Sequence, residues 1–226
     1  MAWDARILHA VGKELSSSPP FEAAEVRGIT YLKVRHARTY EGVSECSGLQ
    51  ILLLVGSGSH ELPLLEPLDR LTRLVISDSA LRTVKGVGDC PSIRDLEIAR
   101  NFLQDLSPLL ACPHLRRVDV TGNPLSRASY EEVIPELTRR GVKVSAPTLQ
   151  ERDLMLRMQA IGLPFAYYQL GGSYRLCRPG LELTDMPEAD HIKMSPQDVQ
   201  DLLDHDPDSL RSIFRRTDLI PTLDSP

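Results

Sequence analysis

Residues 71–92 (LTRLVISDSALRTVKGVGDCPS) and residues 93–114 (IRDLEIARNFLQDLSPLLACPH) repeat one pattern at a spacing of 22. Apolar residues recur at the first, fourth and sixth positions, and the ninth is Ser or Asn. The register extends back to Leu49 and forward to Leu115, and a 20-residue turn precedes it from Ile29. The aligned columns are Leu49, Leu71, Ile93 and Leu115; Leu52, Leu74, Leu96 and Val118; Leu54, Ile76, Ile98 and Val120; and Ser57, Ser79, Asn101 and Asn123. A fixed period predicts a solenoid whose turns stack on one another.

The columns assign a physical role to each part of a turn. The L-x-L segment is a short strand whose alternate side chains point inward. The polar side chain at the ninth position pairs with backbone groups that the turn would otherwise bury unpaired. Since serine reaches less far than asparagine, we expect looser turns at Ser57 and Ser79 than at Asn101 and Asn123.

This spacing resembles the leucine-rich repeat, L-x-x-L-x-L-x-x-N-x-L, in the 22-residue subclass found in internalins and in a regulatory subunit of protein phosphatase 1. The resemblance covers residues 27–147. It implies an α/β solenoid with parallel β-strands on a concave face, and it implies that partners bind on that face. The similarity to the regulatory subunit would by itself predict a phosphatase partner.

The ends of the repeat array are expected to carry caps, because a solenoid exposes its core there. Residues 1–26 are predicted to form a helical N-terminal cap, with one apolar helix face over residues 2–15. That face is made of Trp3, Ile7, Leu8, Val11 and Leu15. At the other end, Ser129–Glu132 predicts a helix start with a capping box, Gly141 the helix end, and 142–144 a last edge strand.

From residue 148 onward the period is lost, and residues 148–226 are predicted to form a small α+β appendage with a loose tail. Its first helix carries Leu149, Leu154, Leu156 and Met158. The segments 165–170 and 173–177, joined by Gly171-Gly172, predict a β-hairpin. Ser195 is expected to start a second helix, and residues 208–216 a third.

The composition excludes several classes of function. The chain has 226 residues, 42% of them hydrophobic and 25% charged, which is ordinary for a globular protein. A net charge of −5 offers no electrostatic footprint for nucleic acid. No apolar run approaches the roughly 20 residues of a membrane helix, and the first residues lack an apolar block of signal-peptide length. These features predict a cytoplasmic protein without a membrane partner, and the excess of Arg over Lys suggests a bacterial genome.

An acidic segment stands out within residues 182–208, where nine acidic residues accompany a single lysine, Lys193. A solvated acidic face is the favoured interpretation, and a docking surface for a cationic partner is the alternative.

No catalytic, metal or cofactor site is predicted. Three of the four cysteines, Cys46, Cys90 and Cys112, share one repeat column, which indicates small buried residues in a reduced state, with a Cys90–Cys112 disulfide as the alternative. The glycine-rich stretch 55–60 (VGSGSH) lies at a repeat turn, and it lacks the Lys that a phosphate loop requires. Asp204-His205-Asp206 is interpreted as a helix end followed by a capping aspartate.

The residues between the inward leucines are expected to form a ribbon on the concave face. The predicted partner-binding residues are Tyr31, Lys33, Arg35, Ile51, Leu53, Val55, Arg73, Val75, Asp95, Glu97, Arg117 and Asp119. The first of these make the N-terminal edge basic, while Ile51, Leu53, Val55 and Val75 form an apolar patch that is expected to face water. An exposed apolar cluster requires a cover, and a protein partner, the chain's own first 28 residues or a second copy are the three alternatives.

The sequence thus predicts a non-catalytic scaffold, monomeric or weakly dimeric, that binds a protein partner through its concave face. A bacterial regulator or a toxin-neutralising protein is the finer hypothesis. The competing hypothesis is an enzyme or enzyme subunit whose appendage holds the chemistry while the repeats recruit substrate. A pocket lined by Cys177, His191 or His205 with acidic residues would favour that alternative.

Overall fold

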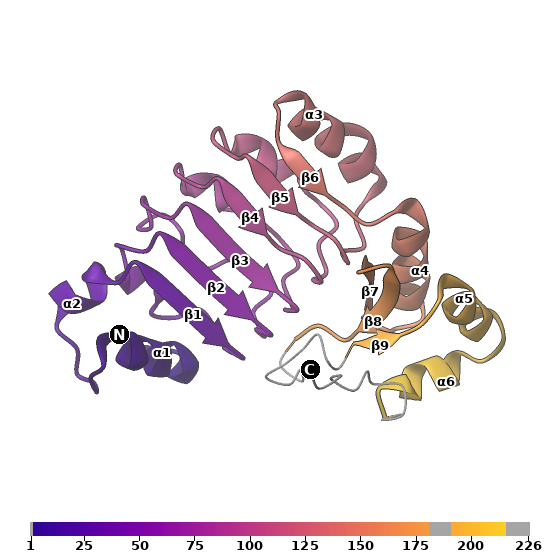
Figure 1. Cartoon of the computed structure of the whole chain (residues 1–226), viewed down its shortest axis with the longest axis horizontal. Coiled ribbons are helices and arrows are strands. Elements are labelled where there is room, and N and C mark those ends of the chain that lie inside the picture. The colour runs from indigo at the N-terminus through magenta and orange to yellow at the C-terminus, as the bar shows by residue number, and fades with distance from the viewer. Residues whose placement is uncertain (1, 181–190, 216–226) are drawn as a thin grey trace.

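The computed structural model describes residues 2–180 and 191–215. Six parallel strands form one sheet in chain order (Figure 1). They are β1 (Tyr31–Arg35), β2 (Ile51–Val55), β3 (Arg73–Ser77), β4 (Asp95–Glu97), β5 (Arg117–Asp119) and β6 (Lys143–Ser145). Leu32, Leu52, Leu74, Leu96 and Val118 are consecutive partners across the first five strands. The predicted leucine-rich repeat register is therefore confirmed residue by residue.

The inward columns form one continuous core. Leu52, Leu54, Leu74 and Ile76 are fully buried, and the hydrophobic cluster runs from Ile7 to Val142. The turns return through irregular chain, and three of them include a short 3₁₀ segment, at Val43–Glu45, Val87–Asp89 and Ser107–Ala111. Because no single turn encloses its own leucines, burial depends on the neighbouring turns.

The polar column behaves as predicted at Asn101, which is fully buried. Its side-chain amide nitrogen donates to the Ile76 carbonyl of the preceding turn at 2.7 Å, and its Oδ1 accepts from the Leu81 N–H at 3.2 Å. Ser79 donates only to the nearby Ser77 carbonyl and accepts from the Ser57 N–H at 2.9 Å. The serine turns are thus joined by fewer hydrogen bonds than the asparagine turns.

A further column sets the direction of the chain after each strand. His36, Gly56, Asp78, Arg100 and Gly122 occupy equivalent positions, and all have a positive φ between 52° and 68°. The stretch 55–60 therefore places Gly56 in a repeat turn, as predicted. The left-handed conformation at the other three positions was not predicted, because only glycine signals it clearly in a sequence.

The N-terminal cap consists of α1 (Ala5–Leu15) and the short α2 (Ala23–Gly28). The Asp4 carboxylate caps α1 through the Arg6 N–H at 2.8 Å, and it also accepts from the Arg38 N–H at 2.9 Å. One side chain thereby starts the helix and attaches it to the turn that follows β1. Ile7 and Val11 are fully buried against the first turn.

At the other end, the predicted capping box at Ser129–Glu132 is wrong. Residues Ser129–Val133 form one wide π-helical turn that continues into α3 (Ile134–Arg139). The Ser129 hydroxyl instead donates to the Gln104 carbonyl and accepts from the Leu106 N–H. Ser129 thus bonds to the backbone of the preceding turn instead of capping the helix.

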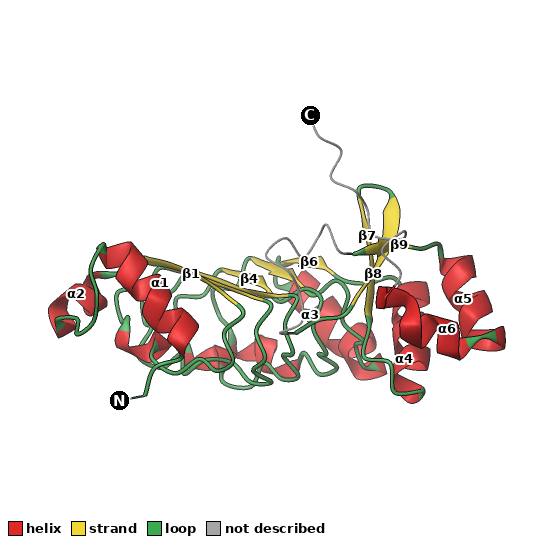
Figure 2. Cartoon of the chain, turned by 90° about the horizontal axis from the view of Figure 1, so that it is seen from below, coloured by secondary structure: helices red, strands yellow, loops and turns green. Residues whose placement is uncertain are grey.

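The appendage contains α4 (Leu149–Ala160), α5 (Pro196–His205) and α6 (Pro207–Ser212) around a three-stranded sheet. The predicted hairpin is present as β7 (Ala166–Leu170) and β8 (Ser173–Cys177), and β9 (Ile192–Lys193) adds an unpredicted third strand. Figure 2 shows this sheet standing at a steep angle to the solenoid sheet. The predicted helix is present as α4, whose buried apolar residues are Leu154, Met155 and Met158, whereas Leu149 is 64% exposed.

Two predicted helix caps of the appendage are present, whereas two other predicted features lie wholly or partly outside the described residues. Ser195 caps α5 through a capping box with Asp198, and Asp206 caps α6, as predicted. The predicted loose tail and much of the acidic segment lie outside the described residues.

Candidate interaction surface

The three outward columns of the sheet lie side by side on the face predicted for binding. The first aligns Tyr31, Ile51, Arg73, Asp95 and Arg117, and the second aligns Lys33, Leu53, Val75, Glu97 and Asp119. Arg35 pairs with Val55 at the carboxyl end of β1 and β2. All twelve predicted residues therefore belong to one ribbon, the concave ribbon.

The apolar patch on the concave ribbon is smaller than predicted. Ile51, Leu53 and Val55 on β2 are half-buried and reach the surface. Val75 is only 5% exposed, so the expectation that it faces water is wrong. Leu53 and Glu97 flank it on the two neighbouring strands, and the Arg73–Glu97 ion pair lies beside it.

The charges at the C-terminal half of the ribbon pair with one another. Arg73 lies 3.6 Å from Glu97, and Arg117 lies 3.3 Å from Asp95. These pairs are largely solvent-exposed and add little to stability. Because the opposite charges face each other across neighbouring strands, the two pairs neutralise the charge on this half of the ribbon.

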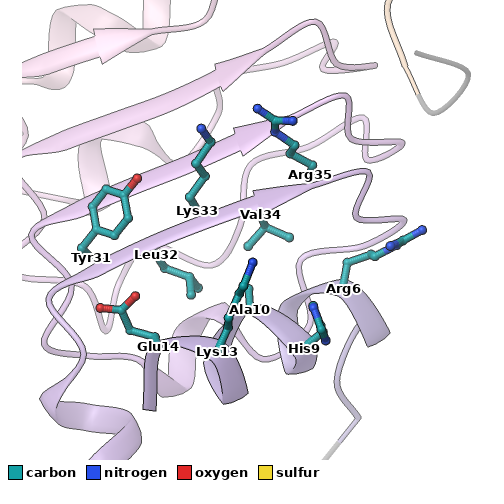
Figure 3. Close-up of a pocket in the computed structure, with 10 residues that line it drawn as sticks. All are labelled: Arg6, His9, Ala10, Lys13, Glu14, Tyr31, Leu32, Lys33, Val34 and Arg35. Atoms are coloured by element: carbon teal, nitrogen blue, oxygen red, sulfur yellow. The ribbon is translucent and has the colours of Figure 1, made fainter. Parts of the chain in front are cut away.

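The N-terminal edge of the ribbon opens into a groove between α1 and β1, with a volume of about 570 Å³ (Figure 3). The α1 wall carries Arg6, His9 and Lys13, and the β1 wall carries Lys33 and Arg35. The basic β1 edge was predicted from the sequence, whereas the basic face of α1 was not. The spacing of Arg6, His9 and Lys13, at i, i+3 and i+7, was the available signal that they share the opposite face.

The appendage meets the solenoid through a buried polar cluster beside the carboxyl ends of β3 and β4. Arg100 binds Asp78 with two hydrogen bonds, at 2.6 and 2.8 Å, and its guanidinium lies 5.0 Å from the Tyr168 ring centre. The Tyr168 hydroxyl lies 2.6 Å from His191 Nδ1, and His191 Nε2 lies 3.5 Å from Asp78 Oδ1. Cys177 is fully buried beside this cluster.

This cluster brings together two of the residues named for an enzymatic appendage, Cys177 and His191, with an acidic residue from the repeats. Their ligand atoms and those of Asp78 lie within 4.8 Å of one another, a spacing that suits a metal ion. Both Asp78 oxygens, however, already accept from Arg100, and that cation opposes a second one at the same place. His205 lies elsewhere, with its Nδ1 3.0 Å from the Asp201 carbonyl.

The environment of Cys177 disfavours thiol chemistry. Burial raises the pKa of its thiol well above the ordinary value, and the nearby Asp78 acts in the same direction. Reactive cysteines have the opposite features, namely a lowered pKa and partial exposure. The cluster is therefore described best as the polar attachment of the appendage to the solenoid.

The other three cysteines lie in the predicted column. Cys46 and Cys90 are fully buried, Cys112 is 5% exposed, and all are free thiols. The Cys90 sulfur lies 3.4 Å from the carbonyl oxygens of Leu68 and Leu71 in the preceding turn.

Among the described residues, no helix combines the length and the apolar composition that crossing a bilayer requires.

No family model matches the chain. The chain is 38% identical over 69 residues to the alpha subunit of geranylgeranyl transferase type 2 from Homo sapiens, which is 29% of this chain and 12% of that protein. It is 31% identical over 136 residues to the subunit from Rattus norvegicus, which is 59% of this chain and 20% of that protein. The chain thus spans a fifth or less of the length of these curated relatives.

Among solved structures, internalin C2 from Listeria monocytogenes is 18% identical, with a TM-score of 0.48 over 65% of this chain and 77% of that chain. A leucine-rich repeat protein from Leptospira interrogans is 23% identical, with a TM-score of 0.48 over 57% of this chain and 34% of that chain. The fold of the present chain follows from its own strand register and aligned core columns.

Proposed function

Since this chain is a leucine-rich repeat protein, we propose that it is a non-catalytic scaffold that binds a protein partner through the concave ribbon. The observation that carries the proposal is the surface of β2, where Ile51, Leu53 and Val55 stay half-buried within the ribbon. A contiguous apolar patch with a polar rim is typical of a protein-binding surface.

The residues around the patch support the same proposal. Tyr31 is 39% exposed next to Ile51, and Arg73 is exposed on its other side. Tyrosine and arginine are the residue types that most often anchor protein interfaces. A partner that covers the patch would therefore also contact one aromatic anchor and one charged anchor.

The position of the N-terminal segment bears on the second alternative, in which the chain covers its own patch. Helix α1 packs at the outer edge of β1 and buries Ile7 and Val11 in the core (Figure 3). Helix α2 contacts α1 and the 3₁₀ turn at Val43–Glu45. Both placements support a partner from outside this N-terminal segment.

The finer elements of the proposal stay predictions. They are a cytoplasmic location, a bacterial source, a monomer or weak homodimer, and a role as regulator or toxin-neutralising protein. The division into a cap (1–26), repeats (27–147) and an appendage (148–226) is likewise proposed as the domain organisation. The raised thiol pKa of Cys177 supports the non-catalytic proposal over an enzymatic appendage.

The test is affinity purification from the native cell with the double variant Ile51→Asp/Leu53→Asp. The matched control is Leu64→Asp/Leu149→Asp, which places the same charges on side chains that are 61% and 64% exposed outside the ribbon. We expect the unmodified chain and the control to retain one common partner, and the ribbon variant to lose it while keeping its thermal unfolding transition.

Other outcomes contradict the proposal in distinct ways. Equal capture by all three proteins would place the binding surface elsewhere. Unfolding of the ribbon variant alone would show that the patch is covered within the chain. A dimer in sedimentation that only the ribbon variant loses would assign the patch to self-association.

A further inference from the structure

The groove between α1 and β1 concentrates positive charge in a protein that is negative overall. In the described part of the chain, Arg6, Lys13, Lys33 and Arg35 line the groove together with one carboxylate, that of Glu14, while the whole chain has a net charge of −5. The chain holds only five lysines, and two of them line this groove. Its volume of about 570 Å³ falls in the range of about 300–1,000 Å³ that is typical of ligand sites.

The charges in the groove differ from those elsewhere on the sheet. On β3 and β5, the exposed arginines have carboxylate partners on the neighbouring strand. Across residues 2–180 and 191–215, no carboxylate forms an ion pair with Arg6, Lys13 or Lys33. The field of these three cations is therefore open to a ligand that brings negative charge.

The edge of β1 indicates what kind of anion fits. The Thr30 carbonyl accepts from the Ile51 N–H, and the His36 N–H donates to the Val55 carbonyl, so the even-numbered residues bond to β2. In a parallel ladder the alternate residues direct their N–H and C=O groups to the opposite side. The backbone groups of Tyr31 and Lys33 consequently point toward the groove, and in the described part of the chain no side chain of α1 bonds to them.

These two features together suit one ligand chemistry. Where the groove separates α1 from β1, the strand edge offers alternating donors and acceptors, which an extended peptide matches by adding a strand. Neither a phosphate nor a lipid headgroup carries such a backbone. Side chains that alternate along the added strand would place carboxylates near Lys33 on one side and near Arg6 and Lys13 on the other.

We propose that the groove between α1 and β1 binds an extended acidic segment of the protein partner, which adds a strand to the edge of β1. The inference rests on the proposed function and specifies the chemistry of the partner at the N-terminal end of the concave ribbon. Lys13, Lys33 and Arg6 supply the charge recognition, and the backbone of Tyr31 and Lys33 supplies the strand pairing.

The experiment measures fluorescence anisotropy of a labelled peptide of repeated Glu-Glu-Thr units, the Glu/Thr peptide, which carries carboxylates on both faces of an extended strand, at low and high salt. The test variant is Lys13→Glu/Lys33→Glu, and the matched control is Lys85→Glu/Lys193→Glu, which changes the net charge equally at exposed positions away from the groove. We expect the test variant to weaken binding at least about tenfold and the control to change it less than about twofold. High salt should weaken binding to the unmodified chain.

Two further peptides separate charge from strand pairing. A Gln/Thr peptide lacks the carboxylates, and a Glu/Thr peptide N-methylated at every residue lacks the backbone donors on both edges. Loss of binding with each supports the proposal. Full binding of the N-methylated peptide would overturn strand addition, and an equal loss in both protein variants would show non-specific attraction.

The remaining outcomes each overturn the inference. No binding of the Glu/Thr peptide would show that the lysines only guard the strand edge against pairing, which is a common use of lysine there. Tighter binding to single-stranded DNA or to anionic vesicles would assign another class of anion. Self-association at low salt that Lys13→Glu/Lys33→Glu abolishes would make a second copy the occupant.

The Ile51→Asp/Leu53→Asp variant distinguishes failure of this inference from failure of the proposed function. If it loses the native partner while the Glu/Thr peptide binds no form of the chain, the proposed function stands and the acidic-peptide inference fails. If it retains the native partner and Lys13→Glu/Lys33→Glu still loses the peptide, the groove binds acidic peptide and the ribbon proposal fails.

Discussion

The hydrogen-bonding role of Asn101 and Asn123 could be predicted from the residue type and its position in the repeat. Each side chain donates to a carbonyl of the preceding turn, Ile76 for Asn101 and Ile98 for Asn123. Each also accepts from a backbone N–H of the preceding turn, at Leu81 and Leu103. The role was predictable because buried backbone groups need partners, and asparagine supplies both a donor and an acceptor.

The cysteines support a prediction about pH. Burial raises the pKa of Cys46 to about 12 and that of Cys112 to about 11, and it also raises the pKa of Cys90 and Cys177. An unfolded chain loses these protons near its ordinary thiol pKa of about 8.5, while the folded chain keeps them. Stability is therefore expected to fall as pH rises from about 8 toward 10.

The measurement combines a urea titration at pH 8 and pH 9.5 with thiol labelling at pH 8. We expect a lower unfolding midpoint at the higher pH. Labelling should be slow in the native protein and complete for four thiols after unfolding. Rapid labelling of native protein at any cysteine would contradict the burial described for the column.

At the scale of elements, the solenoid predicts the cost of removing one inward side chain. Leu74 is fully buried in β3, between Leu52 and Leu96. We expect Leu74→Ala to reduce the free energy of unfolding by about 2–5 kcal/mol, because it leaves a cavity in a shared core. A denaturant titration provides the value, with Leu64→Ala, at a 61% exposed position, as the control. A loss under about 1 kcal/mol would contradict the stacked-turn core.

The apolar pattern of α1 predicts the buried face of the helix but not what its opposite face contacts. Its apolar stripe predicted the cap, and Ile7 and Val11 are indeed buried. The opposite face, with Arg6 and Lys13, became informative only when α1 was placed beside the edge of β1. A periodic pattern identifies which face of a helix is buried, but the partner of the other face depends on where the helix docks.

At the scale of the whole molecule, the appendage contacts the solenoid at the buried Asp78–Arg100 pair. The two side chains are 2% and 11% exposed, so removing one charge leaves the other buried without a counterion. We expect Asp78→Asn to destabilise the protein by about 3 kcal/mol, because breaking one half of a buried pair is costly. Asparagine retains the shape of aspartate and tolerates the left-handed backbone at this position.

Urea unfolding and limited proteolysis measure this effect, since a detached appendage exposes its connection at residues 147–149. The double variant Asp78→Asn/Arg100→Met should recover part of the loss, because it removes the unpaired cation as well. An unchanged unfolding midpoint in Asp78→Asn would show that the buried pair does not hold the appendage.

The sequence alone determined the solenoid, its register and the twelve residues of the concave ribbon. It did so because a stacked repeat is local: each turn contacts its neighbours at a fixed chain separation, so aligned columns in the sequence become aligned columns in space. The hairpin at Gly171-Gly172 was predictable for a similar reason, since a two-residue turn acts within one short segment.

Tertiary structure alone decided which of those residues are accessible to solvent and which other segments contact them. Val75 is buried by its neighbours, α1 forms one wall of the basic groove, and Asp78 and Arg100 anchor a hairpin about 70 to 100 residues later in the chain. These contacts join segments that no repeat period relates. They arise from how a cap and an appendage dock on the finished solenoid, and burial and charge pairing across such interfaces leave no periodic trace in the sequence.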